Sequence, residues 1–121
     1  IRLNLYQPHS TTYGLWRTNN VVPINTWSLV CMVYDADLTT NDPIWYLGTG
    51  GVVSTPAVTE NSTPVGTRTT DVGSNLIIGN HPSATNTWDG YIALEQLLKG
   101  KMITLAEFTN IYNQTKHLYG V

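Results

Sequence analysis

The sequence predicts an all-β protein, an antiparallel β-sandwich of jelly-roll type with one short helix on its C-terminal side. The composition suits strands and turns and disfavours helices, because the 121 residues include 18 Thr, 11 Asn and 10 Gly. Short apolar segments recur at intervals of about 8–12 residues with turn residues between them, as in sandwiches. Only one segment combines a helix start signal with an amphipathic pattern.

The strongest strand signal covers residues 27–34, Trp-Ser-Leu-Val-Cys-Met-Val-Tyr. Its two faces are both apolar, which predicts a central strand that is covered on both sides. Trp27 alternates onto one face with Leu29 and Val33, so we expect its side chain in the core. Residues 2–6 alternate between polar and apolar side chains and predict an earlier strand.

Further strands are expected at residues 44–47, 52–58 and 75–80, and within residues 88–98. Gly48 to Gly51 forms the turn after the first of these, and Pro56 marks an edge or a bulge. Residues 59–74 are rich in Thr, Pro and Gly and show only weak strand character, around residues 65–70.

The expected helix begins at Thr104. Thr104 and Glu107 form a capping box, in which each side chain bonds the backbone amide of the other residue. The apolar side chains that follow fall on one helical face, namely Leu105, Phe108, Ile111 and Tyr112. The helix is about ten residues long, and Gly120 ends the element.

Composition and charge exclude several classes of protein. Six Lys and Arg against eight Asp and Glu give a net charge of −2, which argues against a nucleic-acid partner. No apolar run approaches the roughly 18 residues of a membrane span, so we expect no membrane insertion. Cys31 is the single cysteine, which rules out an intrachain disulfide. The chain length predicts one domain over residues 1–121, and a start at Ile1 without Met suggests that an N-terminal portion is missing.

Five sequence blocks follow one another in an order that is also found in a known protein family. They are Trp27 to Asp35, Ile44 to Gly48, Asn75 to Asn80, Trp88 to Ile92, and the helix from Thr104 to Tyr112. This order resembles the second half of laminin-G-like domains of the concanavalin A-like lectin and glucanase superfamily. The resemblance covers about residues 27–113 and implies a concanavalin A-like β-sandwich. Ala93 to Gln96 departs from the family, which has an acidic pair and a basic residue there.

Catalysis finds no support in the sequence. Glycoside hydrolysis needs two carboxylates about 5–9 Å apart, and the glucanases of the superfamily carry theirs on one strand. The only glutamates are Glu60, Glu95 and Glu107, and none lies in such a pattern. No serine stands in a nucleophile elbow, and the scattered histidines have no zinc-site spacing. We therefore expect a protein that is not an enzyme.

Asp35, Asp37 and Asp42 form the best candidate metal site. The resemblance implies Ca²⁺ at loop carboxylates on the rim of the sandwich, and Ca²⁺ takes six to eight oxygen ligands. The alternative, which the residue types favour, is that these side chains hydrogen-bond their own loop backbone as Asx turns.

The candidate ligand-binding residues lie in the 80–89 loop: Asn80, His81, Asn86, Trp88 and Asp89. They offer hydrogen-bonding groups and one aromatic ring on which a sugar can stack. We expect the site where this loop meets the 35–43 loop, and not on residues 59–74. The alternative for Trp88 is a purely structural plug at the sandwich edge.

These observations predict a non-enzymatic carbohydrate-binding or adhesion module of a larger protein, outside the cell or on a virion or particle surface. Its partners would be a glycan or neighbouring protein subunits, including other copies of the chain. The alternative is a structural virion component, a capsid decoration or fibre protein with a lectin-like fold. Few charges and wide apolar strands suit a protein that packs against neighbours.

Overall fold

A computed structural model describes residues 1–70, 72–73, 77–78 and 88–120 of the chain. The chain divides into two compact units, the first formed by residues 1–69 with 102–121 and the second by residues 70–101. All the described strands and helices belong to the first unit. No helix in the described ranges is long and apolar enough to cross a membrane.

The first sheet has the strand order β1-β2-β6 and is antiparallel throughout. It consists of β1 (Arg2–Gln7), β2 (Gly14–Asn20) and β6 (Val58–Ser62). β1 confirms the strand that the alternation of residues 2–6 predicts. β2 and β6 are not among the expected strands, because β2 buries Gly, Trp and Thr on one face and β6 has one apolar residue. Neither segment shows the alternation of apolar and polar residues that predicts a strand.

The second sheet has the order β3-β4-β5, and it is also antiparallel. It consists of β3 (Ser28–Val33), β4 (Ile44–Thr49) and β5 (Val52–Ser54). β4 and β5 form a hairpin whose two loop residues, Gly50 and Gly51, have φ angles of 55° and 82°. Such a turn favours glycine, because both loop residues need a left-handed backbone. The predicted turn is thus confirmed, although it is shorter than the four residues expected.

Residues 27–34 contain the predicted strand, β3 (Ser28–Val33), but its predicted central position is not found among the described residues. β3 lies at the edge of its sheet among the described residues, and β4 is the central strand. Trp27 lies just before β3 and is 36% exposed, with its ring stacked on Tyr119 at 4.6 Å. An apolar pattern on both faces does not determine which of two paired strands gains a second neighbour. Here the hairpin turn gives that neighbour to β4.

Pro56 lies where the chain leaves one sheet for the other. β5 ends at Ser54 in the second sheet, and β6 begins at Val58 in the first. The segment expected as one strand over residues 52–58 is therefore interrupted, since proline supplies no amide hydrogen to a ladder. The weak strand character expected around residues 65–70 appears as two isolated bridges, Thr12–Val65 and His9–Arg68.

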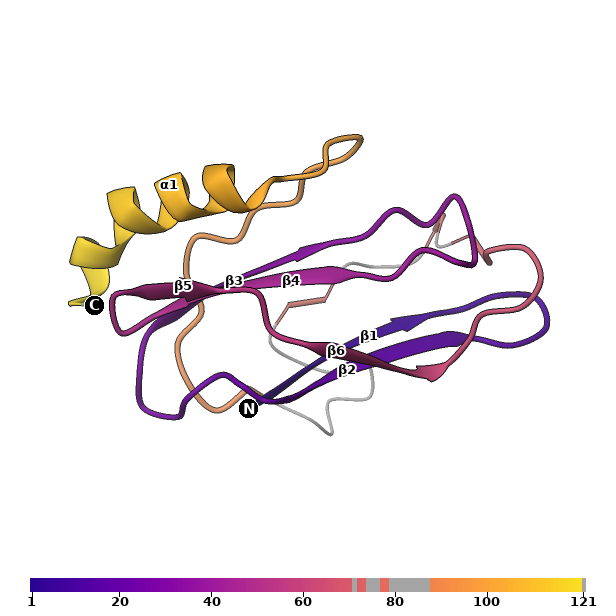
Figure 1. Cartoon of the computed structure of the whole chain (residues 1–121), viewed down its shortest axis with the longest axis horizontal. Helices are drawn as coiled ribbons and strands as arrows, with labels where there is room; N and C mark the ends of the chain where they lie inside the picture. Colours follow the sequence, from indigo (N-terminus) through magenta and orange to yellow (C-terminus); the bar gives the residue numbers. More distant parts are fainter. Residues whose placement is uncertain (71, 74–76, 79–87, 121) are drawn as a thin grey trace. The chain divides into compact units, whose positions relative to one another are not determined.

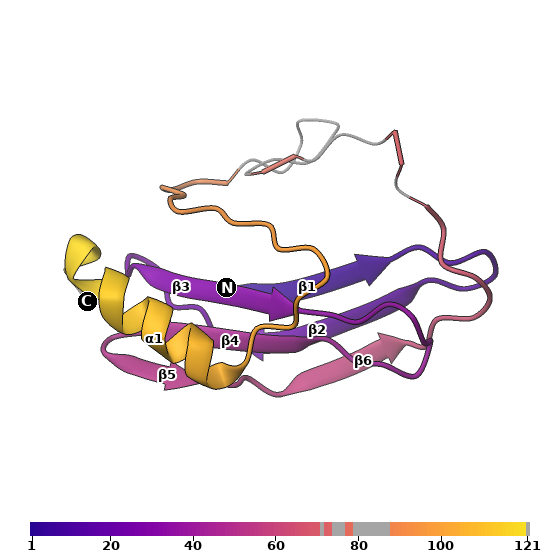
Figure 2. The same cartoon turned by 90° about the horizontal axis from the view of Figure 1, so that it is seen from above.

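Helix α1 (Leu105–Thr115) packs on the second sheet (Figure 1). Figure 2 shows α1 at the end of that sheet, over β4 and its neighbours. Phe108 and Tyr112 are buried, and the Phe108 ring lies 5.5 Å from that of Tyr46 on β4. Tyr112 covers Gly48, and its hydroxyl accepts a hydrogen bond of 2.8 Å from the Gly51 amide. Leu105, expected on the same face, is 44% exposed because it lies in the first turn, at the end of the contact.

The helix start is confirmed in atomic detail. The Thr104 hydroxyl accepts from the Glu107 amide at 3.2 Å, and the Glu107 carboxylate accepts from the Thr104 amide at 2.9 Å. A 3-10 turn, η1 (Lys116–Tyr119), extends the helix to Gly120, whose φ of 70° ends it as predicted.

Replacing Thr104 with alanine is expected to lower the free energy of unfolding by about 0.5–2 kcal/mol, because the first-turn amide loses its acceptor. Urea unfolding followed by circular dichroism measures the change. Thr55→Ala is the matched control, since Thr55 is exposed and lies between strands. Equal stability of the two variants would contradict a stabilising role for the cap.

The second unit departs from the expected strands. The predicted strand within residues 88–98 is wrong: no described residue of this range is in a strand. Leu94 has a φ of 59°, a left-handed conformation that a strand does not admit. Of the strand expected at residues 75–80, Ile77 and Ile78 are described and neither is assigned to a strand. The rest of that strand lies outside the described residues.

The described part of the protein is therefore mostly β, with two antiparallel three-stranded sheets and one short helix. This confirms the all-β class and the single substantial helix within the described ranges.

Candidate functional site

Three connections of the first unit meet at one end of its strands, on the right of Figure 1. They are the β1–β2 loop at residues 8–13, the β3–β4 loop at residues 34–43 and the segment at residues 63–69. Backbone hydrogen bonds join the first connection to the third, from Ser10 N to Thr67 O at 2.9 Å and from Thr69 N to Pro8 O at 3.0 Å. Two parts of the chain separated by more than fifty residues thus form one surface.

Gly66 makes the close approach of these two connections feasible. Its φ is +89°, and a Cβ on Gly66 would lie 2.3 Å from the Ser10 hydroxyl oxygen. Any side chain there would meet both backbone strain and a steric clash. The Gly66 carbonyl lies 3.2 Å from His9 Nδ1, which places the imidazole beside the Gly66 turn.

The β3–β4 loop is ordered by hydrogen bonds of its own polar residues. Asp35 Oδ1 accepts from the Asp37 amide at 3.0 Å, which is an Asx turn, and Asn41 Nδ2 donates to the Asp35 carbonyl at 3.1 Å. Asp42 Oδ1 accepts a 2.6 Å hydrogen bond from the indole Nε1 of Trp16, a fully buried residue of β2. The loop is therefore anchored to the other sheet through Asp42.

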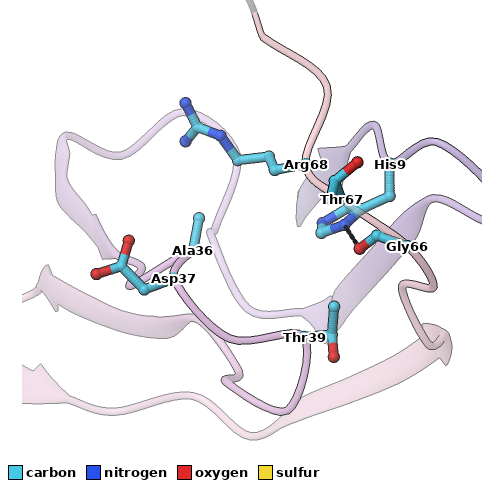
Figure 3. Close-up of a pocket in the computed structure, with 7 residues that line it drawn as sticks. All are labelled: His9, Ala36, Asp37, Thr39, Gly66, Thr67 and Arg68. Atoms are coloured by element: carbon cyan, nitrogen blue, oxygen red, sulfur yellow. Dashed lines mark hydrogen bonds between the residues drawn. The ribbon is translucent and has the colours of Figure 1, made fainter.

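A cavity of about 500 Å³ opens between the β3–β4 loop and the segment at residues 63–69 (Figure 3). It is lined by seven residues, and we call it the loop-end cavity: His9, Ala36, Asp37, Thr39, Gly66, Thr67 and Arg68. Figure 3 shows Ala36 and Asp37 on one side and His9, Gly66 and Thr67 on the other, with Thr39 below and the Arg68 side chain reaching across the top. The cavity thus brings one carboxylate, one guanidinium, one imidazole and two hydroxyls around one space.

Two buried polar atoms near this end have no hydrogen-bond partner among the described residues, His9 Nε2 and Tyr34 Oη. Burial of the hydroxyl raises the pKa of Tyr34 above its usual range, the nearby Asp42 carboxylate raises it further, and Arg68 opposes the rise. The Tyr34 ring packs on Trp16 with the ring centroids 5.2 Å apart. Trp16 and Tyr34 thus form an aromatic contact at this end of the unit, and neither is among the residues that line the loop-end cavity.

The predicted metal ligands are only partly brought together with the cavity. Asp37 lines it, whereas Asp35 and Asp42 use an oxygen each in the structural hydrogen bonds given above. In the described parts of the chain, no three His, Cys, Asp or Glu side chains gather into a set that could hold a metal ion. The Asx-turn alternative is thus observed at Asp35, and calcium stays a prediction.

The predicted ligand-binding residues belong to the second unit. Asn80, His81 and Asn86 lie outside the described residues. Trp88 is 44% exposed and its indole lies against Gly90, where a Cβ would be 2.9 Å from Nε1. Asp89 is exposed beside it. Their part in a binding site stays a prediction.

The loop-end cavity includes five residues that the sequence did not predict as site residues, namely His9, Thr39, Gly66, Thr67 and Arg68, whereas the predicted site lay away from residues 59–74. One usable signal was present, because Arg68 is the only cation in a segment of Thr, Pro and Gly. The partnership of Arg68 with His9 depends on a bridge between distant residues that no local pattern encodes.

Comparison of the chain with protein-family models, with curated proteins and with solved structures finds no match.

Proposed function

We propose that this chain is a non-enzymatic carbohydrate-binding or adhesion module of a larger surface protein. The protein lies outside the cell or on a particle surface, and the module binds a glycan in the loop-end cavity. The observation that carries the proposal is the chemistry of that cavity. Asp37 accepts hydrogen bonds, Arg68 donates them, and the hydroxyls of Thr39 and Thr67 do both.

A sugar presents hydroxyl groups that each donate and accept, so it needs a surface that mixes both functions at close range. The cavity volume of about 500 Å³ falls within the usual range of small-ligand pockets, roughly 300–1,000 Å³. Its position also supports the proposal, because binding residues are disproportionately found on loops that a rigid scaffold positions. Here two sheets hold the loops.

The fold proposed for the complete module is a concanavalin A-like β-sandwich of the laminin-G-like type. Two antiparallel sheets, a capped C-terminal helix and the order of the sequence blocks support it. A binding role without catalysis is supported by the single carboxylate, Asp37, among the described residues that line the cavity. Glycosidases use a carboxylate pair.

The test is a glycan array with the parent chain and with Asp37→Asn, which keeps the side-chain shape and removes the charged acceptor. We expect a loss of at least about tenfold in affinity, because a hydrogen bond to a charged group contributes about 1.5–3 kcal/mol. Glu95→Gln is the matched control, since Glu95 is exposed and lies in the second unit. Glycan binding that Asp37→Asn leaves unchanged would place the site elsewhere.

Two further arms address the predictions of the sequence. Trp88→Ala measures whether the second unit contributes a stacking ring. A chelator arm measures whether binding needs calcium at Asp35, Asp37 and Asp42. Absence of binding to any glycan would favour the alternative function.

That alternative is a structural component of a virion or similar assembly, and one observation favours it. β3 has an open edge among the described strands and no charged residue, and Val30 and Met32 are 37% and 39% exposed. An uncharged apolar edge strand readily pairs with another chain. Analytical ultracentrifugation distinguishes the two functions, since an assembly subunit self-associates and a free module stays monomeric.

A further inference from the structure

A second polar depression lies on the first sheet, away from the loop-end cavity. It has a volume of about 150 Å³, and we call it the arginine depression: Arg2, Arg17, Thr18, Asn19, Thr59 and Asn61 line it. Two of the chain's six cationic residues thus share one small surface, although the whole chain carries a net charge of −2.

Both arginines line the same depression on the first sheet. Arg17 is paired with Asn4 on β1 and with Thr59 on β6. Arg2 is paired with Asn20, and a register shift separates this pair from the Asn4–Arg17 pair, so the shared lining of the depression places Arg2 on the same surface as Arg17. Glu60, the acidic residue nearest in the register, is paired with Trp16 and belongs to the opposite face. The sheet therefore separates the arginines from the Glu60 carboxylate.

Among the described residues, neither guanidinium has an acidic partner. In the described part of the chain, the side chains of Arg2 and Arg17 make no hydrogen bond or ion pair. No carboxylate is among the residues that line the depression. Two uncompensated cations side by side repel each other, and an anion bound between them removes that repulsion.

We propose that the arginine depression binds a tetrahedral oxyanion, a sulfate or phosphate group. Guanidinium groups present planar forks of N–H donors that match such oxyanions in a bidentate manner. The amides of Asn19 and Asn61 and the hydroxyl of Thr59 add neutral donors at the rim. The Thr18 hydroxyl is already engaged, because it donates to the Asn19 carbonyl at 2.8 Å and accepts from the Leu3 amide at 3.0 Å. This site goes beyond the glycan cavity and does not depend on it.

The experiment is an NMR titration of isotope-labelled protein with sodium sulfate and sodium phosphate, with sodium chloride at matched ionic strength as the reference. The sulfate and phosphate monoesters of glucose, with glucose itself, form a second series. We expect saturable shifts at the amides of β1, β2 and β6 with the oxyanions and none with chloride or glucose. The ester that binds more tightly than its free ion identifies the source of the group.

Arg17→Gln is expected to weaken oxyanion binding at least about tenfold, since it removes charged hydrogen bonds. Arg2→Gln, at an exposed residue, is a second variant in case the half-buried Arg17 affects folding. Arg17→Lys keeps the positive charge but loses the planar, bidentate guanidinium group. Its affinity for the oxyanion should therefore fall between those of the parent and Arg17→Gln. Lys99→Gln is the charge-matched control, and it should bind like the parent.

Shifts that do not saturate, that chloride reproduces, or that persist in both arginine variants would overturn the proposal. So would an equal loss in Lys99→Gln, because it would indicate diffuse charge attraction. The result is independent of the glycan proposal: Asp37→Asn should leave oxyanion binding unchanged, and Arg17→Gln should leave binding of neutral glycans unchanged.

Discussion

Replacing Trp16 with alanine is expected to lower the free energy of unfolding by about 3–5 kcal/mol, the usual loss for a large buried aromatic side chain. Trp16 is fully buried, its ring packs on Tyr34, and its indole N–H bonds Asp42 at 2.6 Å. The alanine variant leaves a cavity in β2 and also an Asp42 carboxylate without its donor. Denaturant unfolding, read by tyrosine and tryptophan fluorescence, measures the change.

Two further variants test how the loss of stability depends on the burial of the side chain and on its N–H group. Trp88→Ala is the matched control, because it makes the same substitution at a side chain that is 44% exposed. Trp16→Phe keeps an aromatic ring but removes the N–H and part of the indole volume, so its loss of about 1–3 kcal/mol combines the hydrogen bond to Asp42 with a smaller cavity. The expectation is wrong if Trp16→Ala destabilises the protein no more than Trp88→Ala does.

Replacing Gly48 with valine is expected to destabilise the protein by about 1–3 kcal/mol or more, through overpacking against α1. A Cβ at Gly48 would lie 2.5 Å from Tyr112 Cδ2 and 2.7 Å from Tyr112 Cγ. The aromatic ring would have to move, and the hydrogen bond from the Gly51 amide to the Tyr112 hydroxyl would be lost with it. Thermal unfolding by circular dichroism measures the change.

The sign of this effect is informative, because valine favours strands and glycine does not. Without the contact to Tyr112, Gly48→Val would be neutral or stabilising. The same substitution in a Tyr112→Ala background should therefore lose most of its penalty, which gives a double-mutant cycle. A penalty of the same size in both backgrounds would show that α1 does not pack over Gly48.

Features that depend on local chemistry can be predicted from the sequence alone. The alternation of residues 2–6 predicts β1, and the apolar runs predict that β3 and β4 exist. Thr104 and Glu107 predict the helix start and its capping box, because both partners of the cap lie within one turn. Glycine-rich residues predict the β4–β5 turn. Each of these features depends on residues only a few positions apart.

The strand order was decided only by the tertiary structure. The same apolar pattern allows β3 to be central or at an edge, and among the described strands of its sheet β4 is the one that has a neighbour on both sides. Residues 88–98 have an apolar pattern that predicts a strand, but they do not form one. A strand also needs a hydrogen-bonded neighbour, which the local pattern does not specify. β2 was not predicted, because its buried face consists of glycine, tryptophan and threonine and therefore lacks a uniform apolar pattern.

The candidate site also belongs to the tertiary structure, apart from Asp37. His9 and Arg68 are paired across the β1–β2 loop and the segment after β6, and Asp37 comes from a third connection. The Asx chemistry of Asp35 is local and could be anticipated, whereas the hydrogen bond between Trp16 and Asp42 joins a strand of the first sheet to the β3–β4 loop. Local sequence patterns predict hydrogen bonds between a side chain and the backbone of nearby residues. Which side chains share a cavity is set by long-range pairing, and the chain acquires that pairing only when it folds.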